Sequence, residues 1–290
     1  MLDLADRSLA ERWLASIAWL VARLPLGVLP WLGACLGWVA GTLLRIRRRH
    51  VDSAMRRAGL STAHAAAMYC GLGTSVFEFL WMAGSSRSLR AYAHVDEESA
   101  RLLRKAQERG RGVVLAASHT GNWDLAACRM AEDVEVVVVT KRLRVAWLDA
   151  FWQRTRARRG VSLTEGTGAL GVAHEVLGRG GVVAMMIDQV PERTKHGVLG
   201  EFLGAPARVD RAAAVLAARA GAPLVVTAAR RSPEGHVLEV LRVFFPPDRP
   251  SQRWIEETTL DATKALEDFV RRYPSAWLWM HRRWRIGEAS

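Results

Sequence analysis

The stretch Val113–Asp124, VVLAASHTGNWD, joins a short apolar run to a polar turn and so indicates a buried strand followed by a helix. His119, Asn122 and Asp124 lie in the turn, at the carboxyl end of the expected strand. Histidine can act as a general base near neutral pH, and a carboxylate five residues further on can orient its ring. The stretch therefore predicts an α/β fold with a His119–Asp124 pair presented at a strand end.

Spacing alone does not single out this pair. With 8 His and 29 acidic residues in 290, roughly 0.8 histidines followed by an acid at this distance are expected by chance. A second pair, His196 and Glu201, lies in a polar segment with no strand leading into it, and we interpret His196 as a solvated loop residue. For His119 the alternative is a structural histidine in a helix-capping turn.

The rest of the chain predicts a helical lead-in over residues 51–110 and an α/β core over 111–290. In the core, strand-like runs alternate with helical ones, which is typical of a largely parallel sheet flanked by helices. The expected strands are 112–117, 134–140, 181–188, 223–229 and 236–245. The expected helices are 122–131, 145–158, 168–178, 209–220 and 252–272.

Polar side chains follow three of the expected strands. His119 follows the first, Lys141 and Arg142 the second, and Asp188 and Gln189 end the third. Ligands of open parallel sheets gather beyond the carboxyl ends of the strands, so these residues form one candidate site. Asp188 could pair with a nearby arginine, help to order His119, or cap a helix.

The chemistry that suits these residues is direct transfer with a general base. No Ser or Cys lies in a nucleophile elbow such as GxSxG, so a covalent intermediate is not indicated. Backbone N–H groups around Gly121 and Asn122, at an expected helix N-terminus, could stabilise an oxyanion. Arg159, together with the basic pair of the second strand end, could bind anionic parts of a substrate, the alternative being solvated surface charges.

The composition favours an anionic partner. The formal net charge is +12, and only four of the 41 basic residues are lysines, which leaves arginine forks suited to phosphate and carboxylate. The charge is spread along the chain without a nucleic-acid-binding motif, so no nucleic acid is expected. Three cysteines far apart suggest neither disulfides nor a zinc site, and neither a metal nor a cofactor is expected.

Residues 1–50 predict a membrane anchor with a basic flank. Between Trp13 and Leu44 the only charge is Arg23, and Leu24–Leu44 is long enough to cross a bilayer as a helix. Two prolines and four glycines interrupt it, so a spanning helix, an interfacial hairpin and a buried helix pair all remain open. The basic run at residues 45–50 follows directly, which favours an anionic membrane surface and a cytoplasmic location for the domain behind it.

Six segments together carry a resemblance to a known family. The chain resembles the lysophospholipid acyltransferase superfamily and, more specifically, the late acyltransferases of bacterial lipid A biosynthesis. After the apolar anchor and its basic flank, the segments are HTGNWD (119–124), KR (141–142), MMIDQ (185–189), FLGAPA (202–207), RAGAPLVV (219–226) and YPSAWLWMHRRW (273–284).

The resemblance implies transfer of an acyl chain from acyl carrier protein or coenzyme A to a hydroxyl of a membrane glycolipid or phospholipid, at the cytoplasmic face of the inner membrane. His119 and Asp124 match the family's H-x4-D/E catalytic pair. Many members carry a second acid shortly after the residue that matches Asp188, and this chain has none there. The acceptor is therefore open between a lipid A precursor, a lysophospholipid, a mannosylated phosphoinositide and an aminolipid.

Two hypotheses from other classes compete with acyl transfer. One is a non-catalytic basic protein that binds anionic lipid, and the other is a hydrolase in which water replaces the acceptor. Replacing His119 separates a binder from an enzyme, and analysis of the products separates a hydrolase from a transferase.

Overall fold

The computed structural model describes residues 8–165, 168–191, 193 and 196–284. The helices are α1 (Leu9–Val21), η1 (Leu26–Val28), α2 (Leu29–Trp38), η2 (Val39–Leu43, π-helical), α3 (Arg48–Arg57), α4 (His64–Gly84), α5 (Glu97–Gln107), α6 (Trp123–Met130), α7 (Ala146–Arg158), α8 (Ala169–Gly178), α9 (Ala212–Ala220), α10 (Gln252–Arg272) and η5 (Pro274–Ala276). The strands are β1 (Ala93–Val95), β2 (Val113–Ala117), β3 (Val136–Val139), β4 (Val161–Thr164), β5 (Val182–Met186), β6 (Gly197–Phe202), β7 (Ala205–Asp210), β8 (Leu224–Ser232) and β9 (Gly235–Phe244).

Within the described residues, seven strands form one sheet in the order β1-β9-β8-β2-β5-β3-β4, and β6 and β7 form a separate antiparallel hairpin. β2 pairs in parallel with β5 on one side and with β8 on the other. β3 and β4 continue the parallel arrangement, whereas β8 and β9 are antiparallel. The carboxyl ends of β2, β3 and β5 therefore meet at one edge of the sheet, where ligands of such folds bind.

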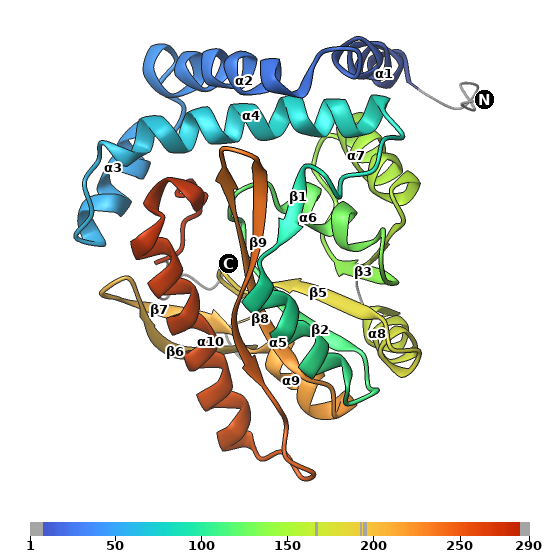
Figure 1. Cartoon of the computed structure of the whole chain (residues 1–290). Helices are drawn as coiled ribbons and strands as arrows, with labels where there is room; N and C mark the ends of the chain where they lie inside the picture. Colours follow the sequence, from blue (N-terminus) through green and yellow to red (C-terminus); the bar gives the residue numbers. More distant parts are fainter. Residues whose placement is uncertain (1–7, 166–167, 192, 194–195, 285–290) are drawn as a thin grey trace.

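Helices cover both faces of this sheet (Figure 1). Because successive side chains of a strand point to opposite faces, Val114 and Ala116 of β2 enter one core and Val113 and Leu115 enter the other. The first core is completed by α3, the first half of α4, α8, α9 and α10, and the second by the second half of α4, α5, α6 and α7. A continuous apolar strand such as β2 is thus buried on both sides, which fixes the place of the turn that follows it.

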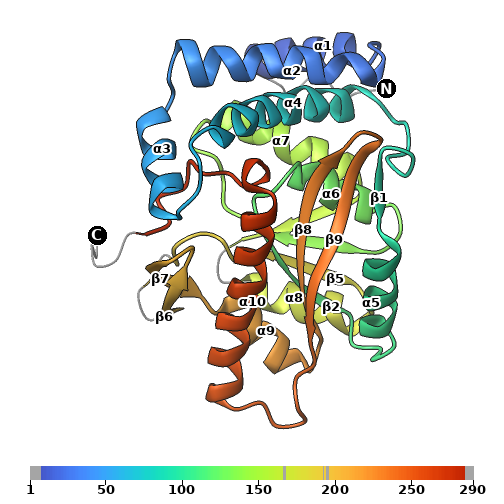
Figure 2. The same cartoon turned by 60° about the vertical axis from the view of Figure 1, so that its left-hand side comes forward.

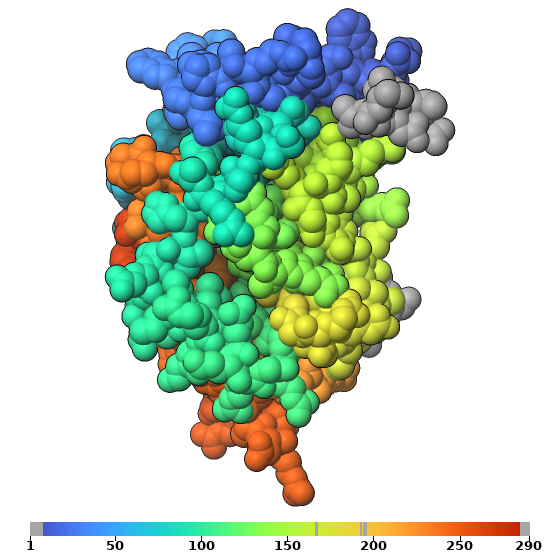
Figure 3. Space-filling view, turned by 45° about the vertical axis from the view of Figure 1, so that its right-hand side comes forward, coloured from blue at the N-terminus to red at the C-terminus, as the bar shows by residue number. Residues whose placement is uncertain are grey.

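The N-terminal helices form a layer on top of α4 (Figures 1 and 3). A Cβ atom added at Gly33 of α2 would lie 2.2 Å from the Thr74 Cα, and one at Gly37 would lie 2.2 Å from the Tyr69 carbonyl oxygen. The two helices therefore approach backbone to backbone along a glycine face, as small residues allow. Leu26–Leu43 is long and apolar enough to cross a membrane by length and composition.

The outer side of this N-terminal layer is apolar and exposed. Trp13, Trp19, Trp31 and Trp38 are between 53% and 77% exposed, and only 22% of the candidate span is buried. An ordinary buried helix pair, one of the three interpretations of this segment, does not fit such exposure. Contiguous exposed apolar surface of this kind marks an interaction site, for example with a membrane.

The predicted fold class is confirmed. Each of the five expected strands and five expected core helices is present, with ends shifted by at most three residues. The sequence did not predict β1 and β4, which are only three and four residues long, or the β6–β7 hairpin. β1 lies inside the lead-in that was expected to be helical, because a short edge strand lacks enough residues to show a period.

Candidate active site

The chain turns through residues 118–122 between β2 and α6. The side-chain oxygen of Asn122 accepts a hydrogen bond from the Leu125 backbone N–H (3.1 Å) and so caps α6. Gly121 has φ +56°, and a Cβ there would lie 2.7 Å from the Ala229 carbonyl oxygen. Glycine is needed at this position both for the left-handed backbone and for the close approach to β8.

The C-terminal segment 274–278 packs against this turn. The Gly121 N–H donates to the Ala276 carbonyl (2.8 Å), and the Leu278 N–H donates to the His119 carbonyl (3.0 Å). The Gly121 N–H is thereby engaged within the protein, which corrects its expected role as an oxyanion donor. Two segments that both contribute to the family resemblance are thus paired, although most of the chain separates them.

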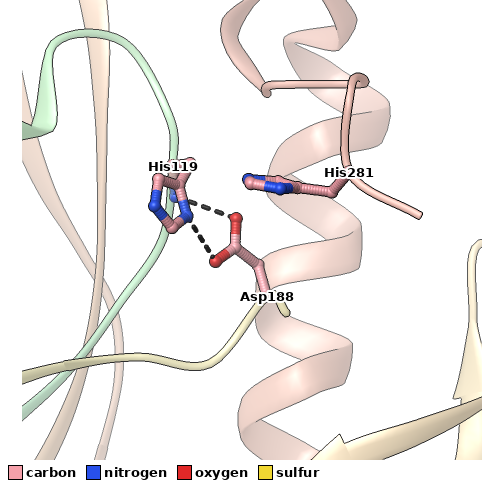
Figure 4. A group of neighbouring side chains, drawn as sticks. All are labelled: His119, Asp188 and His281. Atoms are coloured by element: carbon pink, nitrogen blue, oxygen red, sulfur yellow. Dashed lines mark hydrogen bonds and ion pairs between the residues drawn. The ribbon is translucent and has the colours of Figure 1, made fainter. Parts of the chain in front are cut away.

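His119 is oriented by Asp188 (Figure 4). Its Nδ1 lies 2.9 Å from Asp188 Oδ1, and its backbone N–H donates to Asp188 Oδ2 over 2.9 Å. The Trp277 indole N–H also donates to Oδ2 (2.9 Å), so the carboxylate is fixed from three directions. With Nδ1 carrying the proton that Asp188 accepts, Nε2 is unprotonated and its lone pair can accept a proton.

Charge and burial act in opposite senses on this pair. Burial lowers the pKa of His119, but the Asp188 carboxylate outweighs it, and the pKa of His119 is raised above its ordinary value of 6.5. Burial likewise raises the pKa of Asp188, but its bonds with His119 hold that pKa well below the usual range. Asp188 is therefore an anion near neutral pH and makes the imidazole a stronger base.

Asp124, which was expected to orient His119, has other partners. One of its oxygens lies 2.7 Å from Nε and 2.6 Å from an Nη of Arg156, and the other accepts from the Trp152 indole over 3.1 Å. Asp188 occupies the position beside Nδ1 instead, because the end of β5 lies next to the end of β2. The structure thus gives the orienting contact to the second carboxylate that the sequence placed near the site.

A second imidazole, that of His281, lies beside the pair (Figure 4). The rings of His119 and His281 are 4.6 Å apart between centroids, and the His281 Nε2 is buried without a hydrogen-bond partner among the described residues. Burial lowers the pKa of His281 to about 4, with Arg47 and Arg283 among the further causes, so this ring is neutral near pH 7. Sequence reasoning did not single out His281, although it lies in YPSAWLWMHRRW (273–284), one of the segments that carried the resemblance.

The same trio is also the group whose donor atoms are close enough to hold a metal ion within the described part of the chain. The ligand atoms of His119, Asp188 and His281 lie within 4.8 Å of one another. Two of these ligand atoms, His119 Nδ1 and an Asp188 oxygen, are already joined by a hydrogen bond. This bond leaves Nε2 as the ring nitrogen that can accept a proton.

Comparison with known proteins shows the family to which the chain belongs. Residues 65–286 match the bacterial lipid A biosynthesis acyltransferase family. The chain belongs to this family. No curated protein sequence matches it. Among solved structures it is similar to the 1-acyl-sn-glycerophosphate (LPA) acyltransferase PlsC from Thermotoga maritima, at 12% identity and a TM-score of 0.36, over 85% of this chain and 97% of that one.

In this acyltransferase, α4 holds the turn after β2 through a buried carboxylate. Glu78 accepts a hydrogen bond from the Asn122 side chain (2.8 Å) and is bound by Arg231, by Tyr92 (2.7 Å) and by His236 (2.9 Å). Burial raises the pKa of Glu78, but these partners outweigh it and hold the pKa well below its usual range. Sequence reasoning missed this network, because its members lie far apart along the chain and form no motif.

Among the basic residues expected to bind substrate, Arg159 instead binds backbone carbonyls of the protein itself. Its guanidinium donates to the carbonyls of Met82, Ser85 and Arg87 and so holds the chain after α4. Burial lowers the pKa of Arg159. Carbonyls at a helix end lack partners within the helix, and an arginine that binds several of them fixes where the helix stops.

Lys141 and Arg142 lie after β3, and Gln189 lies after β5, as the sequence predicted. Only one of the three lies close to His119. The Gln189 amide nitrogen is 3.5 Å from the His119 Nε2. Arg142 is exposed and paired with Glu165 (2.6 Å), and Lys141 beside it is exposed too. Of these residues, the structure brings only Gln189 to the His119–Asp188 pair.

Two cavities of the acyltransferase share Trp123 as a lining residue. One is lined by His119, Trp123, Arg231 and Tyr273, among other residues. The other lies between the sheet and α6 and is lined mainly by apolar side chains. Its lining includes Leu103, Leu115, Ala117, Ala126, Ala127, Met130, Val136, Val138, Ala184, Met185, Leu238 and Val240.

Proposed function

We propose that this protein is a membrane-associated O-acyltransferase that moves a fatty acyl chain from acyl carrier protein or coenzyme A to a hydroxyl of a membrane glycolipid such as a lipid A precursor. The observation that carries the mechanism is the His119–Asp188 contact, which supports Nε2 as the general base. Lysophospholipids, phosphoinositide mannosides and aminolipids are the other candidate acceptors.

The reaction needs one proton acceptor and no covalent enzyme intermediate. His119 Nε2 takes the proton of the acceptor hydroxyl as its oxygen attacks the thioester carbonyl. The tetrahedral intermediate then collapses, the C–S bond breaks, and the departing thiolate takes the proton back from His119. Asp188 keeps the tautomer correct and stabilises the transient imidazolium, which makes Asp188 a positioning residue.

The apolar cavity beneath α6 is our proposed binding site for the acyl chain. It shares Trp123 with the cavity that His119 lines, so a chain bound in it would bring the thioester toward Nε2. Apolar lining suits a hydrocarbon chain because burial stabilises it by about 0.8 kcal/mol per methylene.

Replacing Ala127 by phenylalanine is expected to shorten the preferred acyl chain. The added ring would occupy part of the apolar cavity, so the kcat/KM for long-chain donors falls by about tenfold or more relative to short ones. Kinetics with a series of acyl-CoA or acyl-carrier-protein donors measure the change. Ala157→Phe, at an exposed position of α7, is the matched control, and an unchanged chain preference in Ala127→Phe would contradict the assignment.

We propose further that the N-terminal layer lies in the membrane interface on the cytoplasmic side. Its inner face is packed lengthwise on α4 through Gly33 and Gly37, while its outer face exposes tryptophans. Tryptophan favours the interface, and the exposed Arg45, Arg47 and Arg49 that follow suit an anionic leaflet. A helix held flat in this way supports an interfacial anchor over a spanning one.

Replacing Leu20 and Leu43 together by serine is expected to weaken binding to vesicles that contain anionic phospholipid by about tenfold or more. Both side chains are exposed on the N-terminal layer, at 58% and 65%. Vesicle co-sedimentation measures the affinity. The control is Leu170→Ser with Leu199→Ser, two exposed leucines on α8 and β6, and equal losses in both double variants would refute an oriented membrane face.

The function itself is tested by product analysis. Detergent-solubilised protein receives long-chain acyl-carrier-protein or acyl-CoA donors and each candidate acceptor, and mass spectrometry identifies the products. Acylated acceptor formed by the wild type, and not by His119→Ala, establishes the reaction and both substrates. Free fatty acid without acylated acceptor would identify a hydrolase, and no product above background would overturn the proposal.

A further inference from the structure

Arg283 is a buried arginine with an unused hydrogen-bonding edge. It is 1% exposed, and its Nη1 donates to the Arg208 carbonyl over 2.7 Å. Nε and Nη2, the adjacent nitrogens that form the side-on fork of a guanidinium, have no acceptor among the described residues. Burial lowers the pKa of Arg283 to about 10, so the group is still a cation near pH 7.

A buried charge with free donors is costly unless an acceptor completes it. The Phe202 ring, 5.1 Å from the guanidinium carbon, supplies a cation–π contact but no hydrogen-bond acceptor for the fork. Two parallel N–H groups match the oxygens of a phosphate or carboxylate in a bidentate pair. The Asp188 and Asp210 carboxylates act on the Arg283 charge without hydrogen-bonding the buried fork, and the oxygens of a phosphate or carboxylate would complete its hydrogen bonds.

A basic hollow of about 230 Å³ lies at the same residue. It is formed between α3 and the C-terminal segment, and no acidic side chain is among its lining residues. These residues are His50, Ser53, Ala54, Arg57, Arg282, Arg283 and Trp284. Arg57 and Arg282 are exposed, so the hollow offers further positive charge that solvent can reach.

The place of this hollow connects it with both the membrane and the catalytic pair. α3 continues directly from the N-terminal layer, and the C-terminal segment lies beside α3 (Figure 2). His281 directly precedes the two arginines, and the His50 Nε2 lies 3.0 Å from the His281 carbonyl oxygen. A group bound here would lie at the membrane side of the molecule, one residue along the chain from the His119–His281 contact.

We infer that the hollow lined by Arg57, Arg282 and Arg283 binds the phosphate ester of one substrate of the acyl transfer. The inference rests on the proposed acyl transfer, and it adds that one of the two substrates is recognised through its phosphate. That phosphate belongs either to the head group of the acceptor lipid or to the phosphopantetheine or nucleotide part of the donor.

Binding is tested first with inorganic phosphate on the full chain in detergent. Phosphate is expected to raise the Tm of the wild type above its value in chloride at equal ionic strength, and to raise it less in R57Q/R282Q. Those two side chains are exposed, so their loss leaves the core intact. R283K, which keeps the charge but lacks the fork, should also lose the effect, and R101Q/R253Q is a control at two exposed arginines on α5 and α10.

Kinetics then identify the source of the phosphate. In R57Q/R282Q, the KM for a phosphorylated acceptor is expected to rise about tenfold to hundredfold, as for loss of charge-assisted hydrogen bonds. The KM for the same acceptor without its phosphate should stay unchanged. A rise in the donor KM instead would assign the site to the donor. Unchanged KM values together with no thermal effect of phosphate would overturn the inference, whereas thermal binding without any acyl transfer would refute only the proposed function.

Discussion

Replacing His119 by alanine is expected to lower the kcat of acyl transfer by about 10²–10⁴-fold, the usual contribution of a positioned general base. Without Nε2 the acceptor hydroxyl must attack with its proton still attached. The KM values should change much less, because the cavities that would hold the substrates keep their other walls. Steady-state kinetics with the donor and acceptor that product analysis identifies give both constants.

His196→Ala is the matched control for this substitution. His196 and Glu201 repeat the spacing of His119 and Asp124, but His196 is exposed and lies before β6, away from the end of β2. The control should keep the activity of the wild type. Equal activity of the His119 variant and the wild type would remove His119 from the mechanism.

Asp188→Asn is expected to lower kcat by about 10²-fold or more, because the amide can no longer favour the productive tautomer or stabilise the imidazolium. The pH dependence should change as well. His119 must be neutral to act, so activity rises with pH as it loses its proton, with a midpoint above 6.5 in the wild type. Without the Asp188 charge, that midpoint moves to lower pH.

Asp124→Asn separates the two carboxylates. Asp124 and Arg156 are 4% and 12% exposed at their side chains, so the substitution leaves a largely buried guanidinium without its charge partner. The unfolding free energy should fall by roughly 3 kcal/mol, with a kcat loss smaller than that of Asp188→Asn. The pH midpoint should fall less than in Asp188→Asn, because the Asp124 charge is a smaller cause of the raised His119 pKa than the Asp188 charge. Thermal unfolding and pH–rate profiles measure these effects, and a larger kcat loss at Asp124 would restore it as the orienting residue.

The sequence predicted the strand order along the chain and the position of His119, because both depend on local pattern. An apolar run such as VVLAA indicates a buried strand, and the polar turn that follows the run indicates where the strand ends. The choice between Asp124 and Asp188 depends on which strands are neighbours. β5 lies beside β2 although β3 and β4 come between them in sequence, and no local pattern states that arrangement.

The contacts of the C-terminal segment were equally beyond the reach of local pattern. The resemblance pointed to YPSAWLWMHRRW as a characteristic segment, but not to its contacts with Asp188 and the turn after β2. Likewise, Glu78 reads in the sequence as an acid inside an apolar helix, and only the tertiary fold brings Arg231 and His236 to it. These contacts depend on which segments pair in the folded chain, and local patterns in a single sequence do not indicate that pairing.

The pairing of segment 274–278 with the turn at His119 also affects when the candidate site can be assembled. During synthesis the β2 turn leaves the ribosome well before the residues that contact it and Asp188, the Ala276 carbonyl and the Trp277 indole. Asp188 gains its third hydrogen bond, and His281 reaches His119, at that same late stage. Under the proposed mechanism, a nascent chain therefore carries its general base well before it has the segment that completes the candidate site.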